Sequence, residues 1–209
     1  TSMIDIAHQA RIGFATADAD CRAAFDCVIP EIIRLALIAK GVPEKMVRFM
    51  YSHLTQTKFQ VCAGGFTSAE QYGGEDQSFG SGQGGGASGA NWVLNQDFIN
   101  RALEAAESQA SIIRHPITHE IATNNGIVFA DDLNQVSMDT TRKRSDAENL
   151  ECLRKSAQLN NDCLRASGGS LNIQKCAFRH LSINNKGTCN DVSHSVLTII
   201  PTTNGDPQS

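Results

Sequence analysis

The sequence has no run of about 18 apolar residues, the length needed to cross a bilayer, and its first residues lack the basic and apolar stretches of a secretory signal. It also has no two cysteines in the C-x-x-C spacing that is typical of zinc sites and redox dithiols. Its seven cysteines are odd in number and scattered. We therefore expect no membrane segment, and reduced thiols in an intracellular compartment, the nucleus or the cytoplasm.

Positive charge is also scarce, because 18 Lys and Arg residues stand against 22 Asp and Glu residues and the net charge is −4. Proteins that bind nucleic acid gather basic residues to neutralise phosphates, so this balance argues against such a role. The objection weakens if the acids are concentrated at a metal site. The chain has 209 residues, 41% of them hydrophobic, which predicts one domain over residues 1–200 and a flexible tail over residues 201–209.

Hydrophobic periodicity predicts strands and helices that alternate without a regular βαβ period. A Gly- and Ser-rich segment over residues 64–90 interrupts them and leads into a helix. This order is typical of an α+β domain, an antiparallel sheet with helices packed on one face. The expected strands are 10–20, 58–62, a hairpin over 124–138, 171–183 and 196–200, and the expected helices are 28–40, 43–56, 92–107 and 145–168.

Carboxylates follow two of the apolar strands. Asp18 and Asp20 lie at the end of the first strand, and Asp131 and Asp132 lie at the tip of the hairpin. Mg²⁺ is typically bound by one or two carboxylates together with substrate phosphates, and two such ions suit nucleotide transfer from a triphosphate. Two adjacent acids are also common in solvated turns, so the pair by itself is a weak signal.

Four motifs in a fixed order carry the specificity. They are Asp20-Cys-Arg-Ala-Ala-Phe-Asp26, then Gly82-Gln83-Gly84 with Ala87-Ser88, then Phe129-Ala-Asp131-Asp132, and finally Gly168-Gly169-Ser-Leu171 with Lys175-Cys176. Together they resemble the palm of reverse transcriptases, over roughly residues 12–183, and the second and fourth look closest to enzymes of retroelements. The resemblance implies a polymerase palm that makes DNA on an RNA template, with a DNA primer and deoxynucleoside triphosphates as partners.

The resemblance also implies a role for each acid. Asp20 and Asp131 would be the main metal ligands, and Asp132 a ligand or a close neighbour of the metals. The metals would be two Mg²⁺ ions, with Mn²⁺ as a substitute.

The other motif residues would contact substrates. Phe25 would lie against the sugar and favour deoxynucleotides, and Gln83 and Gly84 would lie near the templating base pair. Lys175 would lie near the triphosphate and donate a proton to pyrophosphate.

Several of these residues have an alternative interpretation. Phe25 also suits a core position, Lys175 a solvated strand, and Asp26 the cap of the following helix rather than a metal ligand. Asp18 would replace Asp20 if the strand were misread. The basic run 142–144 suits a solvated loop or a phosphate contact.

The histidines at 115 and 119 have i, i+4 spacing, but Pro116 argues against a helical zinc pair. The chain departs from the family where Gly89 replaces the proline that commonly follows the serine of the second motif. Fingers and thumb are expected to be largely missing. The rival functions are a catalytically silent palm used for nucleic-acid binding or assembly, and the palm of an RNA-dependent RNA polymerase; the oligomeric state stays open.

Overall fold

The structure is a computed structural model. It describes residues 3–22, 24–73, 80, 86–106, 111–124, 126–129, 132–183 and 189–191. Contacts divide the chain into two compact units, one of residues 1–22, 99–164 and 170–209, the other of residues 23–98 and 165–169. Within the described residues, no helix is long and apolar enough to span a membrane.

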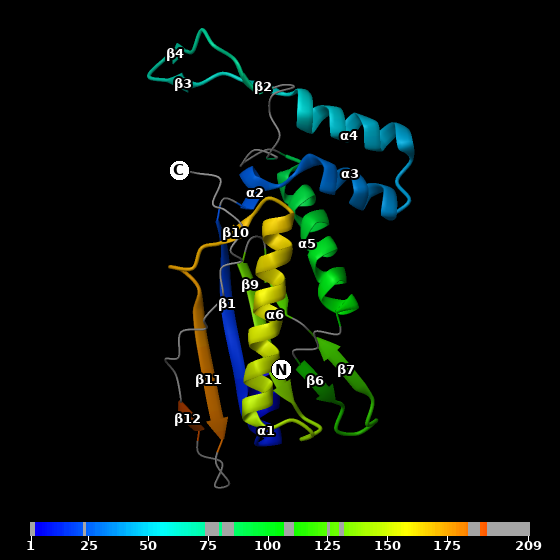
Figure 1. The fold of residues 1–209 in the computed structure, drawn as a ribbon, viewed down its shortest axis with the longest axis vertical. Coiled ribbons are helices and arrows are strands. Elements are labelled where there is room, and N and C mark those ends of the chain that lie inside the picture. Colours follow the sequence, from blue (N-terminus) through cyan, green and yellow to red (C-terminus); the bar gives the residue numbers. More distant parts are fainter. Residues whose placement is uncertain are drawn as a thin grey trace. The chain divides into compact units, whose positions relative to one another are not determined.

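An eight-stranded sheet forms the centre of the first unit (Figure 1). Its strands are β1 (Phe14–Arg22), β6 (Ser111–Arg114), β7 (Ile121–Asn124), β8 (Ile127–Phe129), β9 (Asp132–Asp139), β10 (Ser170–Leu171), β11 (Ala177–Ile183) and β12 (Cys189–Asp191). They run in the order β12-β11-β1-β9-β6-β7, and β10 pairs with β1 while β8 pairs with β9. The two strands that carry predicted metal ligands, β1 and β9, are therefore direct neighbours.

Strand β1 is closely covered on one face, because its buried and less buried residues alternate. Ala15 and Ala17 of the covered face pack against Leu153 of helix α6 (Asp146–Ala166), which lies along the sheet (Figure 1). Gln135 of β9 donates a hydrogen bond from the same face to Ser156 of α6, at 2.9 Å. The residues between these positions in β1 and β9 consequently point to the opposite face.

A helix also covers one end of that opposite face. Helix α1 (Met3–Ala10) brings Ala7 into a cluster with Phe14 and Met138. Phe14 begins β1, six residues before Asp20, which is about 20 Å along an extended strand. The α+β class is confirmed, and α1 adds a helix on the face that was expected to stay open.

The sheet is mixed rather than purely antiparallel, because β6 pairs parallel with β9. In that pair Ser111, which is completely buried, lies opposite Met138. Strands β6 and β7 form a hairpin (Figure 1) that the periodicity did not predict. Each has four residues, and β7 is exposed throughout, so neither leaves a clear alternation of apolar and polar residues.

The second unit contains mainly helices. Pro30 in the first turn of α3 and Gly41 at a φ of 75° just after its end confirm the expected start and stop of that helix. Lys40 forms an ion pair with Asp97 at 2.9 Å. The elements are α2 (Ala24–Cys27), α3 (Pro30–Ala39), α4 (Glu44–Gln56), the first part of α5 (Ser88–Ala105), and two short sheets, β2 (Lys58–Phe59) with β5 (Tyr72–Gly73) and β3 (Cys62–Ala63) with β4 (Phe66–Thr67).

Some boundaries differ from those expected. The cap of α3 is Ile29, without a side-chain hydrogen bond, so the interpretation of Asp26 as the cap of this helix was wrong. Helix α5 begins four residues before the expected Trp92, at Ser88, and the single strand expected over 58–62 is two shorter strands. The strand expected over 196–200 and the tail over 201–209 lie outside the described residues.

The start and the stop predicted for α6 are confirmed. Ser145 and Glu148 form the expected capping box, in which the Ser145 amide donates to the Glu148 carboxylate at 2.7 Å and the Glu148 amide donates to Ser145 Oγ. The hydrogen bonds that the Ser145 amide and hydroxyl donate to the carboxylate hold the pKa of Glu148 below its usual value. The chain leaves the helix at Gly168, where φ is 97° and a Cβ would collide with the carbonyl oxygen of Cys27.

Candidate active site

The register of the sheet brings two of the predicted metal ligands together. Asp20 of β1 lies directly opposite Asp132 of β9. Strand β8 pairs with the same end of β9, with Phe129 opposite Asp132. Residues directly opposite in an antiparallel pair have Cβ atoms about 5 Å apart on the same face. Two carboxylates from separate motifs therefore share one patch of the sheet.

A second polar pair continues this patch. Asp18 lies opposite Asn134, two residues further along the same strands, and so on the same face. Together with Lys175, these four residues line a hollow of about 260 Å³. Asp132 and Asn134 are exposed and Asp18 is half-buried. We call this group, Asp18, Asp20, Asp132, Asn134 and Lys175, the acidic hollow.

Lys175 supplies the only positive charge among the residues that line the acidic hollow. Its Nζ lies 3.4 Å from Asp20 Oδ2, and its side chain is 68% exposed. It belongs to a turn between β10 and β11, rather than to the strand that the motif predicted. A pair this exposed adds little to stability, so the lysine is free to move toward another anion.

The turn that carries Lys175 is tied to β1 by one backbone hydrogen bond and closed by another. The Asn172 amide donates to the Asp20 carbonyl at 2.8 Å, and the Lys175 amide donates to the Asn172 carbonyl at 2.9 Å. Cys176 follows in this turn. Burial raises the pKa of its thiol, and the charge of Asp20 raises it further. The thiol therefore stays protonated at neutral pH, and it donates to the Asn172 carbonyl.

Three predicted site residues, Asp131, Gln83 and Gly84, lie outside the described residues. Within the part of the chain that the structure describes, no three His, Cys, Asp or Glu side chains are grouped to hold a metal ion. The predicted set of three aspartates is therefore represented here by Asp20 and Asp132 alone.

Phe25 belongs to the second unit and packs on an aromatic neighbour there. Its ring centroid lies 6.1 Å from that of Trp92, with the planes tilted by 60°. Phe25 is half-buried and Trp92 is 2% exposed. This packing accords with the core interpretation, and the predicted contact with a sugar stays a prediction.

The two histidines that were considered as a zinc pair lie in the turn between β6 and β7. His115 Nδ1 accepts hydrogen bonds from the amides of Ile117 and Thr118, at 3.3 and 3.1 Å. His119 has a φ of 60°. His115 thus stabilises the turn through Nδ1.

The fold is similar to that of a telomerase. The solved structure is apo telomerase from Candida Tropicalis, truncated from the C-terminal domain, and it matches with a TM-score of 0.57 and 12% sequence identity. The match covers 92% of this chain and 38% of the telomerase chain, so this chain spans well under half of that length. No family model and no curated protein matches the sequence.

At this identity the telomerase likeness shows the fold, and the residues of the site must be judged on their own chemistry. The sequence pointed to Asp20 and Asp132 through their motifs and kept Asp18 only as a substitute for Asp20. It missed Asn134 as a member of the site. The alternation of Asp132-Leu-Asn134 with buried Leu133 was the available signal, because period 2 places both polar residues on one face.

Proposed function

We propose that this chain is the catalytic palm of an RNA-directed DNA polymerase, which adds nucleotides by two-metal chemistry. The observation that carries the proposal is the register that sets Asp20 opposite Asp132 on the face of the sheet that α6 does not cover. Asp131, the third predicted carboxylate, directly precedes Asp132 in the sequence.

The donor chemistry of the acidic hollow fits hard divalent cations. Carboxylate and amide oxygens surround it, and Mg²⁺ prefers such oxygen ligands. Asp20, Asp131 and Asp132 would hold two Mg²⁺ ions, with Mn²⁺ as a substitute. When bound, such ions lower the pKa of the primer 3′-hydroxyl and stabilise the charge on the leaving pyrophosphate.

The chain's own residues would orient the substrates around these acids. Lys175 is held near Asp20 by its turn, and its exposed ammonium would move to the triphosphate and donate a proton to pyrophosphate. Phe25 would pack against the sugar and disfavour a 2′-hydroxyl, and Gln83 and Gly84 would contact the templating base pair.

The partners follow from this reaction and from the fold. An RNA template, a DNA primer and deoxynucleoside triphosphates are the substrates of such an enzyme. The telomerase-like fold supports this class, because telomerase is a reverse-transcriptase-related enzyme. The net charge of −4 is compatible with the proposal if fingers and thumb supply the basic surfaces that bind the duplex.

Primer extension on an RNA template, by the polymerase that contains this palm, tests the proposal. Asp131→Asn keeps the shape of the side chain and removes its charge, so we expect extension to fall at least about 100-fold. Asp162→Asn, the same change on α6 away from the acidic hollow, is the matched control and should keep full extension.

Retained DNA synthesis by Asp131→Asn would contradict the proposal. A wild-type polymerase that binds primer and template but extends neither would identify the catalytically silent palm instead. Preference for ribonucleotides would identify the palm of an RNA-copying RNA polymerase.

A further inference from the structure

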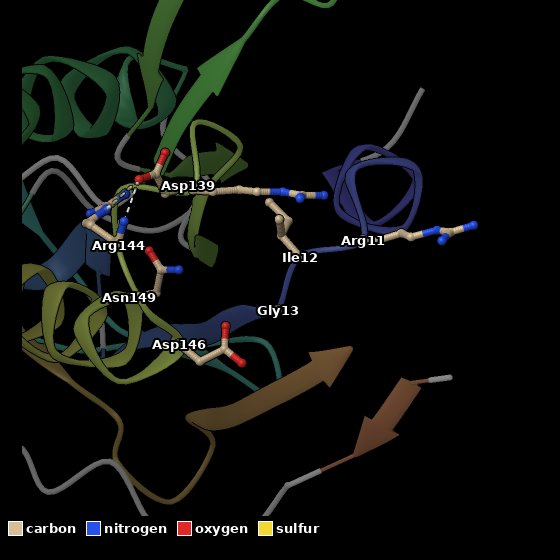
Figure 2. A pocket seen from close by; sticks show the side chains of 8 residues that line it. Arg11, Ile12, Gly13, Asp139, Arg144, Asp146 and Asn149 are labelled. Atoms are coloured by element: carbon tan, nitrogen blue, oxygen red, sulfur yellow. Dashed lines mark hydrogen bonds and ion pairs between the residues drawn. The ribbon is translucent and has the colours of Figure 1, made fainter. Parts of the chain in front are cut away.

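A second hollow lies at the opposite end of the same two strands. It has a volume of about 230 Å³, and residues before β1, after β9 and at the start of α6 line it (Figure 2). Asp139 is seven residues from Asp132 in β9, which is about 23 Å along an extended strand. We call this group the distal hollow; its lining residues are Arg11, Ile12, Gly13, Asp139, Arg142, Arg144, Asp146 and Asn149.

One wall of the distal hollow is fixed by Asp139, whose hydrogen-bonding capacity is fully used by the fold. Its Oδ1 accepts from the Thr141 amide at 2.8 Å and from the Thr141 hydroxyl, and its Oδ2 accepts from the amides of Lys143 and Arg144 at 3.0 and 2.9 Å. Arg144 Nε lies 3.9 Å from the same carboxylate. Asp139 and Arg144 thus form one wall of the distal hollow. The Asp139 carboxylate has no hydrogen-bonding capacity left for a ligand.

The floor of the distal hollow has oxygen acceptors with spare capacity. Asn149 is 3% exposed, and its Oδ1 accepts no hydrogen bond from the described residues. Asp146 Oδ2 accepts from the Ser182 hydroxyl at 3.2 Å, which leaves Oδ1 for another donor. Figure 2 shows both side chains projecting from α6 into the hollow. A buried acceptor without a donor is costly, so this floor favours a ligand that brings N–H groups.

Gly13 makes room for this floor. A Cβ at Gly13 would lie 2.5 Å from Asp146 Oδ1, so only glycine lets the carboxylate lie against the start of β1. The position of Asp146 therefore depends on a residue 133 positions earlier in the chain.

The rim of the distal hollow is positively charged. Arg142 is exposed and donates through Nη2 to the Ala10 carbonyl at 2.9 Å, which anchors its guanidinium and leaves its other N–H groups for an anion. Arg11 lines the hollow, but its side chain points away from it (Figure 2). The hollow therefore combines acceptors on the floor with the Arg142 cation at the rim.

We propose that the distal hollow binds one unpaired nucleotide whose base carries an exocyclic amino group. The amino group has two N–H bonds, one for Asp146 Oδ1 and one for Asn149 Oδ1, while Arg142 binds the attached phosphate. Ile12 gives the base an apolar wall. Cytosine fits this pattern, whereas uracil presents a carbonyl oxygen that two acceptors repel.

The choice of a nucleotide, among ligands with an N–H edge and a negative charge, rests on the proposed function. The nucleotide comes either free or as part of a single strand. Because the acidic hollow is about 23 Å away along β9, the distal hollow is a binding site separate from the catalytic acids.

The test is a titration of isotopically labelled protein, in which NMR follows the side-chain amide of Asn149. CMP and UMP are matched probes, because they have the same size and differ mainly in the amino and carbonyl groups of the base. We expect CMP to shift the Asn149 signal and to bind at least about ten-fold more tightly than UMP. Equal binding of the two, no shift with either, or the same shift with inorganic phosphate alone would overturn the proposal.

Two variants sharpen this titration. Asp146→Asn replaces an acceptor by a group that also donates, so the preference for CMP should disappear, while Asp162→Asn should keep it. If Asp146→Asn fails to fold, Gly13→Ala serves instead, because its methyl group displaces the Asp146 carboxylate. A preference for CMP that survives in whichever of these two variants folds would overturn the proposal.

Two further experiments distinguish a free nucleotide from a single strand, and distinguish this proposal from the proposed polymerase function. Binding of oligocytidine over oligouridine, tighter than that of CMP, would identify a strand rather than a free nucleotide. Asp20→Asn should keep the preference for CMP, because it changes only the acidic hollow. The distal hollow can thus fail its test while the polymerase proposal holds, and the reverse.

Discussion

Strand β9 carries an aspartate at each of its ends, and the two aspartates have different surroundings. Asp139 is completely buried at the side chain and receives hydrogen bonds from Thr141, Lys143 and Arg144. Asp20 and Asp132 face each other on an open surface, where Lys175 is the ion-pair partner of Asp20. A carboxylate saturated by its own fold holds a loop in place, whereas carboxylates that face each other are costly until a cation binds.

Asp139 makes the stability of the fold depend on pH. Burial by itself would raise the pKa of Asp139, but hydrogen bonds from Thr141 and the Arg144 amide, together with the Arg144 charge, outweigh it and lower the pKa below its usual value. A lowered pKa in the folded state stabilises the protein above the unfolded-state pKa, about 4. That stabilisation is lost as the pH falls through the folded-state value.

The largest expected effect is at the end of β9 where Asp132 faces Asp20, which we call the open end. Asp20→Asn should lower primer extension about 1,000-fold, because it removes a charge that we propose to hold the catalytic metals. The free energy of unfolding of the same variant should lie within about 0.5 kcal/mol of the wild-type value, since the substitution relieves repulsion with Asp132. Activity and denaturant unfolding measured on the same preparation check both parts. A variant that is inactive because it is unfolded would break the comparison.

The next largest effect is at the other end of β9, where Asp139 is buried, which we call the closed end. Asp139→Asn should lower the free energy of unfolding by about 2–3 kcal/mol, because one amide cannot accept all the hydrogen bonds that the carboxylate accepts. Urea unfolding at several pH values measures this. The difference from wild type should be largest above about pH 4 and shrink below it. A difference that does not change with pH would mean that the charge of Asp139 is not what stabilises the loop.

The smallest effect concerns the cation of the open end. Lys175→Met should change the free energy of unfolding by less than about 0.5 kcal/mol, because its ion pair with Asp20 is largely exposed. Thermal unfolding of this variant beside Arg144→Met gives the matched measurement, since Arg144 is 15% exposed and pairs with a buried carboxylate. A loss above about 1 kcal/mol for Lys175→Met would show that the open end is also structural.

Much of this architecture follows from local signals in the sequence. The start and stop of α6 could be predicted because Ser145 and Glu148 cap one end and Gly168 ends the other. The position of Asp132 at the tip of a hairpin followed from an apolar strand and two acids. The motifs singled out Asp20 and Asp132 together, since their order along the chain matches that of a known family.

Other features depend on contacts between residues far apart in sequence. The parallel pairing of β6 with β9, the packing of α1 on Phe14 and the pairing of Asp18 with Asn134 are set by strand register. Register is determined by the packing of whole faces, and a short segment such as β6 carries too little pattern to indicate its partner.

The sequence by itself determined the ends of α6 and singled out Asp20 and Asp132 as candidate metal ligands, because capping, periodicity and motif order are local properties. Only the tertiary structure decided that Asp20 faces Asp132 across two strands and that Asp139 is saturated by its own loop. An aspartate has the same side chain at each position. Whether its charge is available to a ligand depends on the hydrogen-bond donors that the fold places around it.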